Sequence, residues 1–243
     1  MTVTRDGFLG GRVTLAQPAR GFRAGSDAVL LAAACPARPG ETVLDLGCGV
    51  GAAMYCLAAR VPGLRLTGVE RDPATAHLAR ENGPAGVVEA DVLLLPPALR
   101  RSFDHVICNP PYFPATTAPA ADPARDAALR EGAPGDLTRW VDVALRRSGP
   151  KGSVTFVLRA DRLAEALASM TPRLGDLRVL PVAARRDAPA GRVILRGRKG
   201  ARAPLRLLAP FVMHDGPAHD GDRDSHTPQA QAVLRDGQAL DLG

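Results

Sequence analysis

Short apolar runs alternate with helix-like segments along most of the chain. Thr42–Leu46 (TVLDL) begins with a β-branched pair and ends at glycines, which is typical of a buried parallel strand. The same criterion predicts further strands at 65–69, 86–89, 103–108, 153–158, 177–182, 192–196 and 204–213.

The segments between these strands have helical composition. Asp72 followed by Pro73 is a typical helix start, because aspartate caps the first free amides and proline fits the first turn. Helices are predicted at 28–35, 52–60, 73–82, 137–147 (with Asp136 near its start), 163–170 and 228–235. We interpret AVLLAAAC at 28–35 as a short buried helix rather than a lipoprotein signal, because Asp27 precedes it directly.

Strands that alternate with helices predict an α/β fold with a doubly wound, mostly parallel sheet. Such sheets bind ligands outside the carboxyl ends of their strands. We therefore expect the loops after Leu46, Val69, Val88 and Cys108 to share one rim of the molecule.

Charge adds a weak indication of the partner. The 243 residues carry 31 Lys plus Arg against 25 Asp plus Glu, a formal net charge of +6, and only Lys151 and Lys199 are lysines. This balance favours anionic partners such as nucleic acid, although a biased genome composition would produce the same total. No apolar run approaches the ~18 residues of a membrane span, so we expect no membrane association.

The four cysteines are Cys35, Cys48, Cys56 and Cys108, and none forms a CxxC pair. We expect free thiols in a reducing compartment, and hence a cytoplasmic protein without a metal site.

A glycine-rich turn follows the strand at 42–46. It reads DLGCGVG from Asp45 to Gly51, and Glu70 comes about 20 residues later. Glycines permit a tight turn and close approach of a ligand to the backbone, and an acid at this spacing can accept hydrogen bonds from ribose hydroxyls. Gly47, Gly49 and Ala52 also satisfy a loose dinucleotide fingerprint, so a nicotinamide or flavin enzyme stays an alternative.

The tetrapeptide Asn109-Pro110-Pro111-Tyr112 follows the strand at 103–108. Its prolines stiffen the chain and push Asn109 to an extended backbone. The side-chain oxygen of Asn109 and the carbonyl of Pro110 can then accept hydrogen bonds from one amino group, while Tyr112 offers a flat face to a planar substrate.

Both motifs resemble those of one enzyme class. DLGCGVG, with Asp45, resembles the first motif of the class I S-adenosylmethionine (SAM)-dependent methyltransferases. NPPY resembles the catalytic motif of methyltransferases that act on adenine N6, guanine N2 or glutamine amides. With the segments 20–31, 193–200 and 227–235, the chain is most similar to the bacterial family of tRNA(Val) adenine-N6 methyltransferases.

This resemblance implies a Rossmann-like fold with a seven-stranded sheet and short terminal extensions. It implies an N-terminal extension with a cofactor-facing helix at 1–40, a SAM-binding catalytic domain at 41–200 and a C-terminal extension at 201–243. The implied catalytic residues are Asn109, Pro110 and Tyr112. The implied cofactor-binding residues are Gly25, Ser26, Asp27, Asp45, Gly47, Gly49, Gly51, Glu70, Asp91 and Asn109.

Basic residues concentrate between Arg185 and Arg206, which favours tRNA or another RNA as substrate. The expected substrate-binding residues are Pro111, Tyr112, Phe113, Arg192, Arg196, Arg198 and Lys199. A solvated strand face is the alternative for the arginines. For the whole chain, glutamine N5-methylation of a protein, guanine-N2 methylation of rRNA and a non-enzymatic SAM-binding module stay open.

Overall fold

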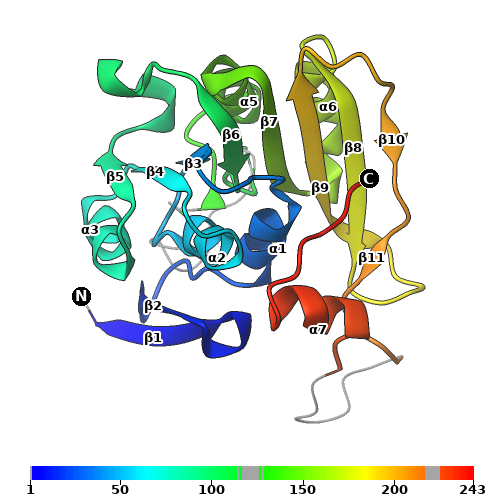
Figure 1. The fold of residues 1–243 in the computed structure, drawn as a ribbon, viewed down its shortest axis with the longest axis horizontal. Helices are drawn as coiled ribbons and strands as arrows, with labels where there is room; N and C mark the ends of the chain where they lie inside the picture. The colour runs from blue at the N-terminus through cyan, green and yellow to red at the C-terminus, as the bar shows by residue number, and fades with distance from the viewer. Residues whose placement is uncertain (1, 114, 117–125, 127–128, 217–224) are drawn as a thin grey trace.

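The computed structural model describes residues 2–113, 115–116, 126, 129–216 and 225–243 (Figure 1). A central sheet of nine strands carries helices on both faces, and a separate two-stranded hairpin lies beside it. The sheet strands are β3 (Thr42–Leu46), β4 (Arg65–Glu70), β5 (Gly86–Glu89), β6 (Phe103–Cys108), β7 (Ser148–Arg159), β8 (Leu174–Ala183), β9 (Ala190–Lys199), β10 (Arg206–Leu207) and β11 (Phe211–Val212).

Helices connect these strands. The α-helices are α1 (Ser26–Ala34), α2 (Ala52–Arg60), α3 (Pro73–Asn82), α5 (Asp136–Arg147), α6 (Leu163–Met170) and α7 (Pro228–Leu234), and the 3-10 helices are η1 (Leu9–Gly11), η2 (Val92–Leu94), η3 (Pro97–Leu99) and η4 (Ala160–Arg162). The Asp72 carboxylate caps α3 by accepting from the Thr75 amide at 2.8 Å. The predicted helix start at Asp72-Pro73 is therefore confirmed.

The strand order places a topological switch point in the middle of the sheet. The order is β10-β8-β9-β7-β6-β3-β4-β5, and β11 also pairs with β8. From β3 the chain builds outward through β4 and β5, then returns to place β6 on the other side of β3. All pairs are parallel except those of β9 with β7 and β8. Ligands of doubly wound sheets bind at this reversal, outside the carboxyl ends of the strands.

Alternation along the strands divides the core into two layers. Val43 and Ile107 face the layer that holds α1, α2, α3 and α7, whereas Leu44 and Val106 face the layer that holds α5 and α6. In Figure 1, α1 and α2 lie in front of the sheet and α5 and α6 lie behind it. Burial on both faces explains why the sequences of these strands are mostly apolar.

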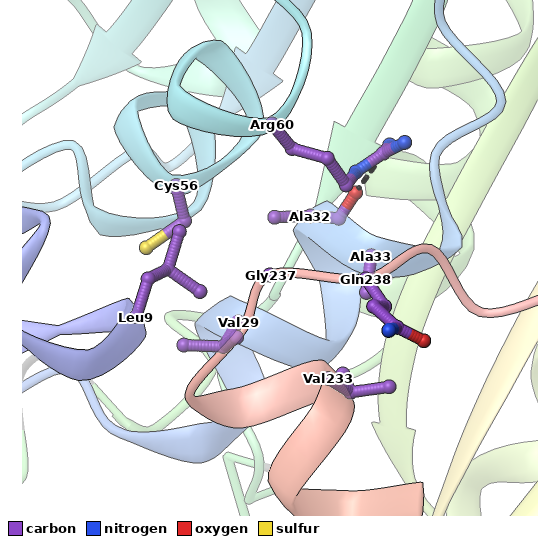
Figure 2. Close-up of a pocket in the computed structure, with 9 residues that line it drawn as sticks. All are labelled: Leu9, Val29, Ala32, Ala33, Cys56, Arg60, Val233, Gly237 and Gln238. Atoms are coloured by element: carbon purple, nitrogen blue, oxygen red, sulfur yellow. Dashed lines mark hydrogen bonds between the residues drawn. The ribbon is translucent and has the colours of Figure 1, made fainter.

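The N-terminal hairpin consists of β1 (Val3–Phe8) and β2 (Val13–Pro18). Asn82 at the end of α3 exchanges two hydrogen bonds with the backbone of Ala16, which ties the hairpin to the sheet assembly. On the same side, α7 packs against α1. A cavity of about 10 Å³ lies between α1, α2 and the segment after α7 (Figure 2), and it has room for about one water molecule.

Most predicted elements are confirmed. The bounds at 42–46, 52–60, 73–82, 86–89, 103–108 and 163–170 agree with the structure. The resemblance implied seven strands and the sheet has nine, because the predicted strand at 204–213 forms two dipeptide strands on the edge of β8. The hairpin was not predicted, and β7 begins at Ser148 rather than Ser153 because Ser148 pairs with Phe103.

Candidate active site

The carboxyl ends of four strands meet at one rim, as predicted. Leu46 at the end of β3 pairs with Val69 on one side and with Cys108 on the other, and Glu70 at the end of β4 pairs with Glu89 of β5. The glycine turn, Glu70 and Asn109 therefore leave the sheet side by side.

The glycine turn is held by backbone geometry and by Glu70. Gly47 has a φ of 68°, and a Cβ there would lie 2.7 Å from the ring of Trp140 on α5. One Glu70 carboxylate oxygen accepts from the Gly49 amide at 3.0 Å, and the other accepts from the Asp72 amide at 2.9 Å. Glu70 thus sits beside the turn with further lone pairs on both oxygens.

Two glycines of the site border open space. A Cβ at Gly49, or at Gly25 before α1, would meet no atom within 4 Å. Gly51 differs, because a Cβ there would lie 2.4 Å from the ring of Tyr55. Packing therefore accounts for glycine at Gly47 and Gly51, whereas Gly25 and Gly49 leave room for a ligand near the backbone.

Asp45 is a buried carboxyl group at the end of β3, with 2% of its surface exposed. Burial raises its pKa to about 8, and the nearby Glu70 adds to this, while a backbone hydrogen bond from Met54 acts in the opposite direction. Within the described chain, Oδ2 of Asp45 has no hydrogen-bond partner. A buried unpaired acceptor is costly, so Asp45 is a candidate ligand-binding group.

Asn109 presents a second unpaired acceptor directly after β6. Its side-chain Oδ1 is buried and has no hydrogen-bond partner among the described residues. Asn109 directly follows β6, and Asp45 lies on the neighbouring β3 at the switch point. Two buried oxygens that lack donors at one rim are what a site for a donor-bearing ligand requires.

Tyr112 is held by residues from two distant elements. Its hydroxyl donates to Oδ2 of Asp27 on α1 at 2.5 Å, and the same oxygen accepts from Nε of Arg192 on β9 at 3.0 Å. The Arg192 guanidinium lies over the Tyr112 ring, 4.6 Å from its centroid. Burial and the Asp27 carboxylate raise the pKa of Tyr112, so its hydroxyl stays protonated near neutral pH.

A second arginine covers the neighbouring aromatic residue. Arg159 lies 5.1 Å from the centroid of the Phe113 ring, and it pairs in register with Arg192 across β7 and β9. Sequence reasoning missed Arg159 and Trp140, since neither belongs to a motif and both reach the site only through packing of distant elements.

The predicted basic surface is divided between two ends of β9. Arg192 stands at the active rim. Arg196 is half-buried and donates to the Ala34 carbonyl at 3.2 Å, while Arg198 is exposed at the opposite end. Lys199 donates to the carbonyls of Leu145 and Ser148 at 3.0 and 2.8 Å and borders a hollow of about 300 Å³ there.

The remaining predicted cofactor residues also lie at the rim. Ser26 is exposed in the first turn of α1. Asp91 is exposed after β5, and its carboxylate accepts from the Leu93 amide at 2.8 Å. Pro110 and Pro111 connect Asn109 to Tyr112.

The described residues also bear on three expectations: those about a metal site, a membrane span and the cysteines. These residues contain no group of three metal-ligating side chains. Their helices are all too short or too polar for a bilayer span. All four cysteines are buried free thiols, and burial raises the pKa of Cys35 and Cys56 to about 12.

Sequence comparison identifies relatives that cover most of the chain. Residues 22–122 match the family model described as methyltransferase small domain. A Dickeya chrysanthemi protein named tRNA1(Val) (adenine(37)-N6)-methyltransferase is 30% identical over 231 residues, or 88% of this chain and 87% of that protein. A protein of the same name from Aeromonas hydrophila is 33% identical over 187 residues, covering 74% of this chain and 78% of its own length.

Solved structures agree on the fold. A protein of Agrobacterium tumefaciens described as a "predicted O-methyltransferase" has a TM-score of 0.69 and 27% identity, covering 88% of this chain and 98% of its own. A T. thermophilus 16S rRNA N2 methyltransferase, solved with AdoMet and guanosine, has a TM-score of 0.56 and 20% identity, covering 82% of this chain and 50% of its own. The second likeness concerns the fold alone.

Proposed function

This chain belongs to the same methyltransferase family as the tRNA1(Val) (adenine(37)-N6)-methyltransferases, and from that membership we propose that it transfers a methyl group from SAM to the exocyclic N6 amine of an adenine in tRNA. Following the names of its relatives, the first candidate target is adenine 37 of tRNA1(Val).

The observation that carries this proposal is the buried, unpaired Oδ1 of Asn109. An exocyclic amine has two N–H donors. Asn109 Oδ1 and the Pro110 carbonyl would accept one hydrogen bond each, and this would aim the nitrogen lone pair at the methyl donor. The neutral amine needs no strong base, because its proton can leave after the methyl group arrives. Positioning and electrostatic stabilisation of this kind supply much of enzymatic rate acceleration.

The residues at the rim fit SAM. Its sulfonium supplies an activated methyl group. The unpaired Asp45 oxygen and the open space at Gly25 and Gly49 suit a polar ligand that lies against the backbone. Glu70, held by the Gly49 and Asp72 amides, would accept from the ribose hydroxyls, and the exposed Asp91 would lie beside the adenine.

A hydroxyl group as the methyl acceptor fits this site less well. A hydroxyl becomes a good nucleophile by losing its proton to a base. Asn109 and Pro110 offer only neutral acceptor oxygens, and the nearby Asp27 carboxylate already accepts from Tyr112 and Arg192. An amine, by contrast, needs only these neutral acceptor oxygens and no base.

The aromatic wall supports a nucleobase. Tyr112 and Phe113 would flank a base that has left its stack, and Arg192 and Arg159 add positive charge beside them. Arg192 lies at the active rim, whereas Arg198 and Lys199 lie at the opposite end of β9, so we propose Arg192 as the RNA contact at this rim. A tRNA substrate and free thiols agree with the expected cytoplasmic location.

The test uses purified protein with labelled SAM and three parallel acceptors: total tRNA, total rRNA and a protein extract. We expect label in tRNA and, after nucleoside digestion, N6-methyladenosine. A tRNA1(Val) transcript should accept methyl groups, whereas a transcript with guanine in place of adenine 37 should not. The Asn109→Ala variant is the negative control for catalysis.

Each alternative predicts a different outcome of the same assay. N2-methylguanosine in rRNA would identify a guanine enzyme, and labelled glutamine would identify a protein substrate. SAM binding without any transfer would identify a binding module. Any of these results would contradict the proposal.

A further inference from the structure

Three side chains from distant parts of the chain form a closed triangle beside Asn109. Tyr112 follows β6, Asp27 lies in the first turn of α1 and Arg192 lies on β9. Tyr112 and Arg192 both donate to Oδ2 of Asp27, at 2.5 and 3.0 Å, and Arg192 stacks on the Tyr112 ring. Each member therefore touches the other two.

We propose that Asp27 is a positioning residue of the methyl-acceptor pocket, and that it sets the Tyr112 ring by holding its hydroxyl and by fixing Arg192 across one ring face. This role rests on the proposed function, because it concerns the residues that would receive the target base. It differs from the cofactor contact that the sequence resemblance implies for Asp27.

The geometry restricts the ring in two directions. The tether from the hydroxyl to Oδ2 limits movement of the tip of the Tyr112 ring, and the guanidinium blocks rotation toward its own side. A planar base would then stack on the ring face opposite Arg192. Reactions that depend on positioning lose rate when a supporting contact is removed, because the acceptor nitrogen must lie close to the methyl group and in line with it.

Asp27 is already hydrogen-bonded to other side chains of the protein. Its Oδ2 accepts two hydrogen bonds, one of them from a cationic donor, and its side chain is 21% exposed. Bonds of this kind are stronger than those between neutral groups. Replacement of Asp27 should therefore affect the acceptor side of the reaction and leave the affinity for SAM unchanged.

The experiment compares Asp27→Asn, Tyr112→Phe and the double variant with wild-type protein. Trp140 is the single tryptophan of the chain and lies against Gly47, so its fluorescence reports SAM binding at the glycine turn. Methylation of the tRNA substrate is measured at varied SAM and varied RNA concentrations. Asp6→Asn is the matched control, because Asp6 also accepts from two donors, Gln17 and Arg23, but lies on the hairpin.

We expect both single variants to bind SAM like wild type and to lose roughly 10- to 100-fold in kcat/KM for RNA, the loss typical of a hydrogen bond to a charged group. The double variant should lose no more than the worse single variant, since both changes remove one interaction. Asp27→Glu should recover part of the activity. Asp6→Asn should match wild type.

Other outcomes separate the possible failures. Weakened SAM binding in Asp27→Asn would make Asp27 a cofactor ligand and overturn the inference. Losses that add in the double variant, or wild-type activity in Asp27→Asn, would overturn it as well. If the wild-type protein methylates no tRNA but does methylate another acceptor, the proposed function fails, and the same variants are then compared on that acceptor.

Discussion

The two ends of β3 and β6 carry polar clusters of opposite character. At the amino end, His105 contacts Glu41 and Ser153, each at 2.7 Å, and the Asp104 carboxylate accepts from the amide and hydroxyl of Thr42 at 2.8 and 2.7 Å. At the carboxyl end, Asp45 and Asn109 each keep a buried oxygen without a partner among the described residues.

This difference distinguishes structural from functional polar groups. Side chains at the amino end satisfy one another and join neighbouring strands. Acceptors at the carboxyl end are buried but unsatisfied, which lowers the stability of the free protein and leaves hydrogen-bonding capacity for ligands. Replacements at the two ends should therefore have opposite consequences for stability and activity.

The largest expected effect is on turnover, from Asn109→Ala. Loss of a positioned acceptor should lower kcat by about 10²- to 10³-fold, while SAM affinity stays close to wild type. Thermal stability should fall little, because Oδ1 of Asn109 has no partner among the described residues and only the side-chain hydrogen bond to Tyr112 is lost. Calorimetry for SAM, a methylation assay and a melting curve check all three. Equal losses of SAM binding and turnover would make Asn109 a structural residue.

Asp45→Asn tests the second unpaired acceptor. We expect SAM affinity to fall by roughly 10- to 100-fold, because a ligand donor that bonds to the carboxyl oxygen loses its acceptor when an amide NH2 takes that place. The pKa of Asp45 is raised to about 8, against about 3.9 in the unfolded chain. The folded protein therefore holds the proton between these values, and its stability falls as pH rises through that window.

The asparagine variant has no such proton to lose. Without ligand, its melting temperature should exceed that of wild type. The difference should grow as pH rises from about 4 toward the Asp45 pKa of about 8. Melting curves across this range provide the measurement. A constant margin would mean that Asp45 is ionised in the folded protein at all of these pH values.

His105→Ala tests the amino end. His105 is 7% exposed, and its removal leaves the buried Ser153 hydroxyl without its partner, so unfolding free energy should fall by about 1–3 kcal/mol. Turnover at a temperature where the variant is folded should equal that of wild type. His77→Ala is the control, because His77 is exposed and pairs with Glu81 at i,i+4. Denaturant unfolding and the methylation assay give the two readouts.

The smallest effect concerns acid stability. Hydrogen bonds from the amide and hydroxyl of Thr42 lower the pKa of Asp104. A lowered pKa adds stability above the unfolded value of about 3.9, and that contribution disappears as pH falls through the folded value. Asp104→Asn should thus flatten the acid limb of the stability profile slightly. An unchanged slope would show that this contact contributes nothing.

Local chemistry made much of this architecture predictable. The glycine turn needs positive φ at Gly47, Gly49 and Gly51, and the Asp72-Pro73 start of α3 follows from capping rules. The hairpin was harder to predict, because β1 is polar and half-exposed and β2 is held by contacts with α3. Likewise, β7 begins at Ser148 because that residue pairs with Phe103 of β6, ahead of a register shift that precedes the Ser153–His105 pair.

The sequence by itself determined the parallel α/β class, the glycine turn and the Asn109–Tyr112 motif, because each depends on residues close together in the chain. The tertiary structure alone decided which arginine reaches Tyr112. Because β9 runs antiparallel to β7, Arg192 stands at the active rim and Lys199 at the opposite end, where it caps α5. The same long-range packing decides that Asp27 holds Tyr112 and that Asp45 and Asn109 stay unpaired, since partners 85 or more residues apart meet only once the sheet has formed.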